Sequence, residues 1–173
     1  YEILLHGWAP PRRSNVHAPL RWVEGSILPT AVRVQGKPSV TRLKVVAHAL
    51  DSADDQAAFS LAAVRIETGR RHQIRAHTAH VGHATATDGK YAASPSFAAD
   101  RSWCKRNFLH RCHLSFCDRV GARHEVFAPL PPDLTAALGR LAPREAASAA
   151  VLGRWGGGGH SSARSWDSEW SLR

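Results

Sequence analysis

The central part of the chain alternates apolar and polar residues with a period of two, which predicts β-strands. Residues 31–34 (AVRV) and 39–49 (SVTRLKVVAHA) show this alternation, and the QGKP between them predicts a hairpin turn. Residues 49–58 (ALDSADDQAA) are acidic and rich in turn formers, so they predict a connection to a further strand at 59–67 (FSLAAVRIE). In the strand at 39–49, alternate side chains should share one face: Thr41, Leu43, Val45 and Ala47.

Two other stretches follow the helical period. Residues 71–82 (RHQIRAHTAHVG) predict a helix that ends at Gly82 as a left-handed cap. Residues 129–142 (PLPPDLTAALGRLA) predict a short closing helix. Residues 108–116 and 123–128 predict a second hairpin. The inward-facing residues should be Ile74, Thr78 and Val81 in the first helix, and Leu134, Leu138 and Leu141 in the second.

Strands outnumber helices in this pattern, so the fold class is α+β with a largely antiparallel or mixed sheet and a few short helices. A length of 173 residues suits one domain. The periodic pattern occupies residues 1–142. The alanine-rich residues 143–153 predict a helix extension or a linker. Residues 154–173 are rich in Gly, Ser and Trp and predict a disordered tail.

The composition points to a polyanion as partner. The net charge is +9 and the pI is near 10.5, which favours nucleic acid because phosphates bound by basic side chains release counterions. A membrane is the weaker candidate, since no stretch approaches the ~20 apolar residues of a spanning helix. No signal peptide is visible at the start, and three cysteines without a C-x-x-C pair favour a reducing intracellular compartment, the cytoplasm or an organelle.

The densest candidate site is TGRRHQIRAH, residues 68–77. A glycine turn between a strand and a helix directs backbone N–H groups at whatever lies there. Arg75 lies one turn inside the helix, where its guanidinium can bind a carboxylate or phosphate through two parallel hydrogen bonds. The simpler interpretation, a solvated helix surface, is weakened by the turn, the glutamine and the two histidines.

These residues resemble the signature of the RluA/RsuA-like pseudouridine synthases, which isomerise uridine in ribosomal and transfer RNA. The family pattern is T-G-R-T-H-Q-I-R-V-H, then G-H-P, then G-D-x-x-Y. Tyr1 begins a further match to its Y-x-A-L-V-x-G strand, and 107–116 (NFLHRCHLSF) match another segment. The chain departs at Arg71, Ala84 and Thr87, where the family tends to have Thr, Pro and Gly. The matches are Thr68, Gly69, Arg70, His72, Gln73, Ile74, Arg75, His77, Gly82, His83, Asp88 and Tyr91.

The resemblance implies a role for each of these positions. Arg75 should pair with the catalytic aspartate, Tyr1 should stack on the flipped uracil, and Leu109 should line the uracil pocket. The other candidate substrate- or RNA-binding residues are Arg70, His72, Gln73, His77 and Lys90. The resemblance implies RNA as the partner, a monomer, and no metal or organic cofactor. A flipped base costs a few kcal/mol, which basic and aromatic contacts offset.

The family's catalytic aspartate lies in H-R-L-D-x-x-T-S-G, before the tyrosine that Tyr1 matches. The chain should therefore be the C-terminal portion of the catalytic domain, with the N-terminal part of the fold missing and Arg75 without its carboxylate. HALD at 48–51 imitates the motif, but it lacks the arginine and T-S-G, so Asp51 is expected to be a solvated turn carboxylate.

Two alternatives stay open. The histidines at 72–83 and the cysteines and histidines at 104–117 suggest zinc, but no glutamate accompanies them and the cysteine spacings fit no common zinc module. The second alternative is a non-catalytic RNA-binding relative that acts in RNA or ribosome assembly.

Overall fold

The computed structural model describes residues 1–11 and 14–157, and it confirms an α+β fold. The helices are α1 (Gln73–His80), α2 (Ser94–Asp100), α3 (Pro132–Leu138) and α4 (Ala146–Gly156). The strands are β1 (Glu2–His6), β2 (Ser14–His17), β3 (Leu20–Arg21), β4 (Ala31–Val32), β5 (Val40–Asp51), β6 (Asp54–Ile66), β7 (Leu109–His110), β8 (His113–Cys117), β9 (Arg123–Phe127) and β10 (Leu141–Pro143).

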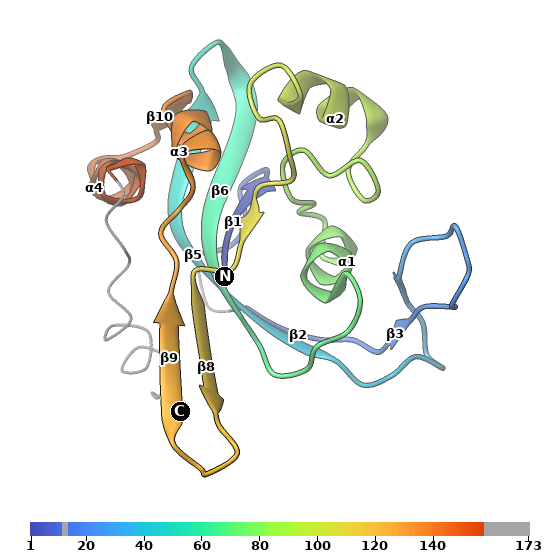
Figure 1. The fold of residues 1–173 in the computed structure, drawn as a ribbon. Coiled ribbons are helices and arrows are strands. Elements are labelled where there is room, and N and C mark those ends of the chain that lie inside the picture. The colour runs from blue at the N-terminus through green and yellow to red at the C-terminus, as the bar shows by residue number, and fades with distance from the viewer. Residues whose placement is uncertain (12–13, 158–173) are drawn as a thin grey trace.

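The main sheet has the order β10-β5-β6-β1-β7, with β2 paired to part of β5 (Figure 1). Every strand pair in the described ranges is antiparallel, as the sequence predicted. The predicted hairpin of 108–116 with 123–128 is present in part. β8 and β9 form a separate two-stranded sheet, but Leu109 and His110 form β7 and pair with β1 instead. No helix among the described residues is long and apolar enough to cross a membrane.

The sequence predicted a hairpin between 31–34 and 39–49, but the central hairpin of the sheet is formed by β5 and β6. The strand at 31–34 does not pair with β5, because Ala31 and Val32 pair with β3 instead. The acidic stretch at 49–58 is not a loop, because β5 continues to Asp51 and β6 begins at Asp54. Pairing between β5 and β6, together with pairing of residues 49–51 with β10, outweighs the weak strand preference of the acidic residues.

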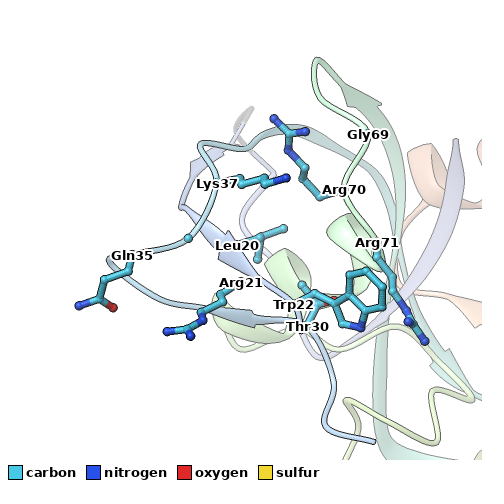
Figure 2. A pocket seen from close by; sticks show the side chains of 10 residues that line it. Leu20, Arg21, Trp22, Thr30, Gln35, Lys37, Gly69, Arg70 and Arg71 are labelled. Carbon is cyan, nitrogen blue, oxygen red and sulfur yellow. The ribbon is translucent and has the colours of Figure 1, made fainter. Parts of the chain in front are cut away.

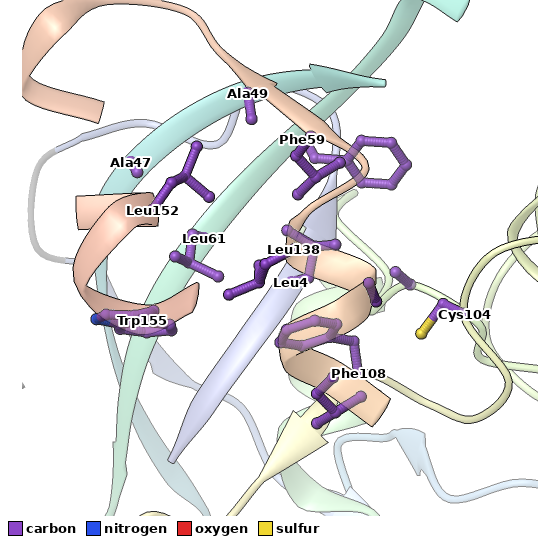
Figure 3. Close-up of a cluster of buried hydrophobic side chains, with 14 of the residues drawn as sticks. Leu4, Ala47, Ala49, Phe59, Leu61, Cys104, Phe108, Leu138, Leu152 and Trp155 are labelled. Carbon is purple, nitrogen blue, oxygen red and sulfur yellow. The ribbon is translucent and has the colours of Figure 1, made fainter. Parts of the chain in front are cut away.

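The sheet buries apolar side chains on both faces. In β1, Leu4 packs with α3 and α4, whereas Ile3 and Leu5 pack with Ile74 of α1 on the other face. Leu134 and Leu138 of α3 and Leu141 are buried as predicted. Figure 3 shows the first of these two clusters, where α3 and α4 cover the sheet.

A β-bulge changes which side chains of β5 share a face. The pairing with β6 shifts between Val45 and Ala47. Leu43 and Val45 therefore face the α1 side, while Ala47 packs on the α3–α4 side. The prediction that Ala47 shares their face is wrong, because the extra residue inverts the alternation beyond it.

The boundary of the C-terminal tail also differs. The prediction began the tail at Arg154, but α4 continues to Gly156 and buries Trp155 to 3% exposure beside Leu152. These two side chains lie three residues apart on one helix face and cover β5 (Figure 3). The remainder of the predicted tail, 158–173, lies outside the described residues.

Candidate active site

The start of α1 is fixed by one buried glutamine. Gln73 is 2% exposed, and its side-chain oxygen accepts hydrogen bonds from the Thr68 hydroxyl (2.8 Å) and the Arg70 backbone N–H (3.0 Å). Its amide nitrogen donates to the Val40 carbonyl (2.9 Å) and the Thr41 hydroxyl (3.1 Å). These four bonds tie the loop before α1 to β5 and use both polar atoms of the Gln73 side chain inside the protein.

The helix begins with an unusual backbone conformation. His72, the residue before α1, has φ 53° and ψ 21°, a left-handed conformation that few non-glycine residues adopt. At the other end, Gly82 has φ 90°, which confirms the predicted left-handed cap. Ile74 and Thr78 are buried as predicted, but Val81 is 46% exposed because the helix ends at His80.

Arg75 binds a carboxylate within the chain. Its Nε and Nη2 donate to the two carboxylate oxygens of Asp88 at 2.6 and 2.5 Å. The prediction that Arg75 has no carboxylate partner in the chain is therefore wrong. Asp88 comes from the G-D-x-x-Y part of the motif, and the connection after α1 folds back to place it beside the helix.

Asp88 is completely buried and accepts further hydrogen bonds from the Thr85 hydroxyl (3.1 Å) and the backbone N–H groups of Lys90 (3.0 Å) and Tyr91 (3.2 Å). Burial alone would raise its pKa. The bonds from Arg75 and the Lys90 N–H outweigh burial and hold the pKa of Asp88 below its ordinary value. Asp88 raises the pKa of Arg75 in return. The pair is thus ionised on both sides.

Tyr91 supports this pair from one side. The Arg75 guanidinium lies 5.1 Å from the centre of the Tyr91 ring, within the range of a cation–π contact. The Tyr91 hydroxyl donates to the Thr30 carbonyl at 3.1 Å and lies 3.1 Å from His72 Nδ1. Burial, followed by the charges of Arg75 and Arg71, lowers the pKa of His72, so its imidazole is neutral near pH 7.

Thr87, the residue before Asp88, is one of the positions where the chain departs from the family pattern. Thr87 has φ 57°, a left-handed conformation that favours glycine, the residue that the family tends to have there. Its backbone N–H donates to Asp100 Oδ2 at 2.6 Å and its hydroxyl to the Cys104 carbonyl at 3.2 Å. These bonds hold a threonine in a backbone conformation that is costly for a β-branched residue.

His77 has a structural position that contradicts its predicted contact with RNA. It is 0% exposed; its Nδ1 lies 2.8 Å from the Thr41 hydroxyl and its Nε2 lies 2.9 Å from the Ala18 carbonyl. Both ring nitrogens are therefore used inside the protein. His83 likewise bonds the His6 carbonyl through Nδ1, at 2.9 Å.

Tyr1 and Leu109 are brought together by the sheet, since the segment that Tyr1 begins pairs with β7. Both pack, partly buried, against the cluster that contains Ile74. Arg111 lies 5.1 Å from the centre of the Tyr1 ring and also donates to the Tyr1 hydroxyl. The predicted uracil-binding pair thus lies on the face of the sheet that α1 covers.

Asp51 is a buried structural residue, and the expectation of a solvated carboxylate is wrong. It is 7% exposed and binds Arg140 through Nε at 2.5 Å and Nη2 at 3.2 Å. The hydrogen bond from Arg140 holds the pKa of Asp51 below its ordinary value. Its hydrogen-bond donors are Ala53, in the turn of the β5–β6 hairpin, and Arg140, just before β10. Neither belongs to α1.

The zinc alternative receives no support from the described residues, where no group of three His, Cys, Asp or Glu side chains is placed to hold a metal ion. The histidines that suggested it bind other protein groups instead, as His77 and His83 show. The three cysteines are free thiols, two of them buried.

Comparison with known proteins agrees with the motif. The model of the RNA pseudouridylate synthase family matches residues 24–80. An uncharacterised RNA pseudouridine synthase of Chloroflexus aurantiacus is 34% identical over 145 residues, which cover 83% of this chain and 42% of that protein. The chain belongs to this family. The RluA/RsuA-like resemblance is thereby confirmed.

Other members of the synthase family show the same partial coverage. Ribosomal large subunit pseudouridine synthase C of Vibrio cholerae is 32% identical over 143 residues, 82% of this chain and 43% of that protein. The chain therefore spans less than half the length of these curated relatives. Among solved structures, human RNA pseudouridylate synthase domain containing 1 has a TM-score of 0.69 at 23% identity, covering 99% of this chain and 64% of that one. This likeness shows that the fold is shared.

Sequence reasoning singled out Arg75 but did not include Asp88 or Tyr91 among the site residues. The signal was present, because both belong to the G-D-x-x-Y match. Of the basic candidates, the Arg70 and Lys90 side chains are exposed, and the Lys90 backbone N–H donates to Asp88.

Proposed function

We propose that the protein is an RNA pseudouridine synthase, and that this chain contributes the part of the active site that holds a catalytic aspartate and the flipped uridine. The observation that carries the proposal is the bidentate pair of Arg75 and Asp88 at the start of α1, in a chain of the synthase family. RNA is the substrate that this function requires, and the net charge of +9 suits it.

Arg75 has donors left for a second carboxylate. A guanidinium has five N–H groups, and Asp88 takes the Nε–H and one of the two on Nη2. Three N–H groups remain on a side chain that is 21% exposed. Asp88 thus acts as a positioning residue that fixes the guanidinium, and the remaining edge binds the catalytic aspartate of the family's H-R-L-D motif.

The uridine is held on the same face of the sheet. Its base stacks on Tyr1 and lies against Leu109, both of which pack beside the Ile74 cluster. Arg111 donates to the Tyr1 hydroxyl, so the ring is oriented before RNA binds. A pre-organised platform lowers the ordering cost of holding a base outside the stack.

Release of tritium from 5-tritiated uridine in RNA tests the proposal. The 173-residue chain should show no turnover, and the same chain extended by its upstream coding sequence, if that encodes an R-L-D segment, should be active. Arg75→Ala should abolish turnover in the extended chain, and Arg75→Lys should restore only part of it, since an ammonium lacks the planar fork.

The matched control is Arg140→Ala, which removes the partner of buried Asp51 and should retain turnover. Turnover by the 173-residue chain alone, or an extended chain indifferent to Arg75→Ala, would contradict the proposal. An extended chain that binds RNA without turnover would support the alternative, a non-catalytic RNA-binding relative.

A further inference from the structure

A basic cavity lies beside the active-site frame. Its volume is about 350 Å³, and three chain segments form it: 20–22 with Thr30, 35–37, and 69–71 (Figure 2). The volume is at the lower end of the range for small-ligand sites. The side chains that matter for its chemistry are Arg21, Trp22, Thr30, Lys37, Arg70 and Arg71.

The charge of the cavity is of one sign. Its lining contains three arginines and one lysine and no carboxylate. Among the described residues none of these four cations forms an ion pair, in contrast to Arg75 and Arg140. Clustered, unneutralised cations raise the local concentration of anions, and a phosphate is the anion that several basic side chains bind together.

The cavity also offers an aromatic surface and a free hydroxyl. Trp22 is 37% exposed, and the guanidinium of Arg71 lies 4.5 Å from its ring centre. Thr30 is 2% exposed, and its hydroxyl has no hydrogen-bond partner among the described residues. An unsatisfied buried hydroxyl destabilises a fold, and a ligand donor or acceptor would satisfy it.

In Figure 2 the cations that could bind a phosphate are separated from the aromatic ring. Lys37 and Arg70 lie at one end, Trp22 and Arg71 at the other, and Leu20 lies between them. A nucleotide has the same arrangement, with its phosphate at one end and its planar base at the other. Aromatic side chains beside a basic groove are how proteins bind single-stranded nucleic acid.

We propose that this cavity binds one nucleotide of single-stranded RNA next to the target uridine. Its phosphate binds Lys37 and Arg70, and its base stacks against Trp22. The proposal rests on the proposed function and extends it. The position fits, because Arg70 and Arg71 lie in the turn that leads through His72 into α1, which carries Arg75. Tyr91, which contacts Arg75, also bonds the Thr30 carbonyl of the cavity.

The cavity distinguishes this chain from the family pattern, which tends to have threonine where Arg71 stands. Arg71 orders one face of the Trp22 ring, so that the opposite face is presented in a fixed orientation. The pair therefore acts as a subsite that selects a stacked base beside the target, in addition to the motif residues shared with relatives.

Fluorescence anisotropy of a labelled uridine pentamer on the protein tests this proposal. Trp22→Ala should weaken binding on the order of tenfold, because base stacking on an aromatic residue contributes about 1–3 kcal/mol. Trp22→Phe should retain most of the affinity, and Arg71→Thr should lose part of it. Lys37→Ala should lower the slope of log affinity against log salt by about 0.7.

Trp8 provides a matched control, since it is 40% exposed and pairs with Arg144 at 4.6 Å outside the cavity. Trp8→Ala should leave the affinity unchanged. Pentamers with one abasic ribose identify the stacked base: removing that base should weaken wild-type binding and have no effect on Trp22→Ala.

Equal effects of Trp22→Ala and Trp8→Ala, or no pentamer binding by the wild type, would overturn the proposal. The proposal would also be overturned if Trp22→Ala lowered the affinity for a heparin fragment as much as the affinity for the pentamer, because the cavity would then recognise charge alone. Binding of the pentamer does not depend on turnover, so failure of the synthase proposal would show in the tritium assay and not in this one.

Discussion

Two buried aspartates in this chain bind an arginine through both carboxylate oxygens, and their surroundings differ. Asp88 accepts five hydrogen bonds, has no exposed surface, and lies against a helix whose first turn is built from the TGRRHQIRAH motif. Asp51 accepts three hydrogen bonds, at the end of a hairpin. The HALD sequence imitates a catalytic motif, yet its aspartate closes a turn.

The difference lies in what each arginine can still do. Arg75 lies over the Tyr91 ring and keeps three N–H groups that Asp88 does not use. Its neighbour Ile74 belongs to the cluster that Tyr1 and Leu109 pack against. Arg140 crosslinks β5 to the segment before β10, where no RNA-binding candidate lies. An identical ion pair is thus part of a proposed active site in one place and a structural crosslink in the other.

The largest difference between the two pairs should appear in stability. Asp88→Asn leaves the Arg75 charge in a buried environment without its counter-charge, which should lower the free energy of unfolding by about 3–5 kcal/mol. Asp51→Asn should cost clearly less, because the Arg140 side chain is 35% exposed and water solvates it. Urea unfolding of both variants measures this, and equal losses would contradict the comparison.

Acid should weaken both pairs, and the contribution of Asp88 can be measured by removing its titrating carboxyl. The folded-state pKa of each aspartate lies below its unfolded value, so the ionised carboxylate stabilises the fold above about pH 4, and this stability is lost as the pH falls through the folded pKa. The melting temperature between pH 2 and 5 should therefore fall less steeply in Asp88→Asn than in the wild type. An unchanged slope would show that Asp88 contributes no such stability.

The smallest expected effect concerns the backbone beside Asp88. Thr87→Gly removes a left-handed strain of about 1–2 kcal/mol but also a hydroxyl bond of about 1 kcal/mol and some chain rigidity. Because these contributions nearly cancel, we expect the melting temperature to change by less than a few degrees. A clear fall would show that the hydroxyl bond to Cys104 outweighs the strain.

The sequence predicted the elements whose signals are local. The presence of α1, its glycine cap and the buried leucines of α3 follow from short patterns and were confirmed, although α1 begins at Gln73, two residues after the predicted start. The face of Ala47 was missed because a bulge, invisible in the alternation, inverts it. Trp155 was assigned to a tail because glycines follow it, although Leu152 three residues earlier indicated a helix face.

The candidate site was predictable in part for the same reason. Arg75 and Gln73 lie inside one dense motif, whereas the partner of Arg75 depends on how the connection after α1 folds back. The basic cavity was not predictable, because it joins Trp22 to Arg71 across a large separation in sequence. Its lining residues come from separate segments that form no recognisable sequence motif.

Turnover of the extended, active protein with Asp88→Asn, against Asp51→Asn, tests the central claim most directly. Both substitutions keep the shape of the side chain and remove one carboxylate, and both are assayed by tritium release at a temperature where each variant is folded. We predict a loss of about a hundredfold or more for Asp88→Asn, because a small displacement of Arg75 misplaces the reacting groups, and near wild-type turnover for Asp51→Asn. Equal turnover in the two folded variants would contradict the account.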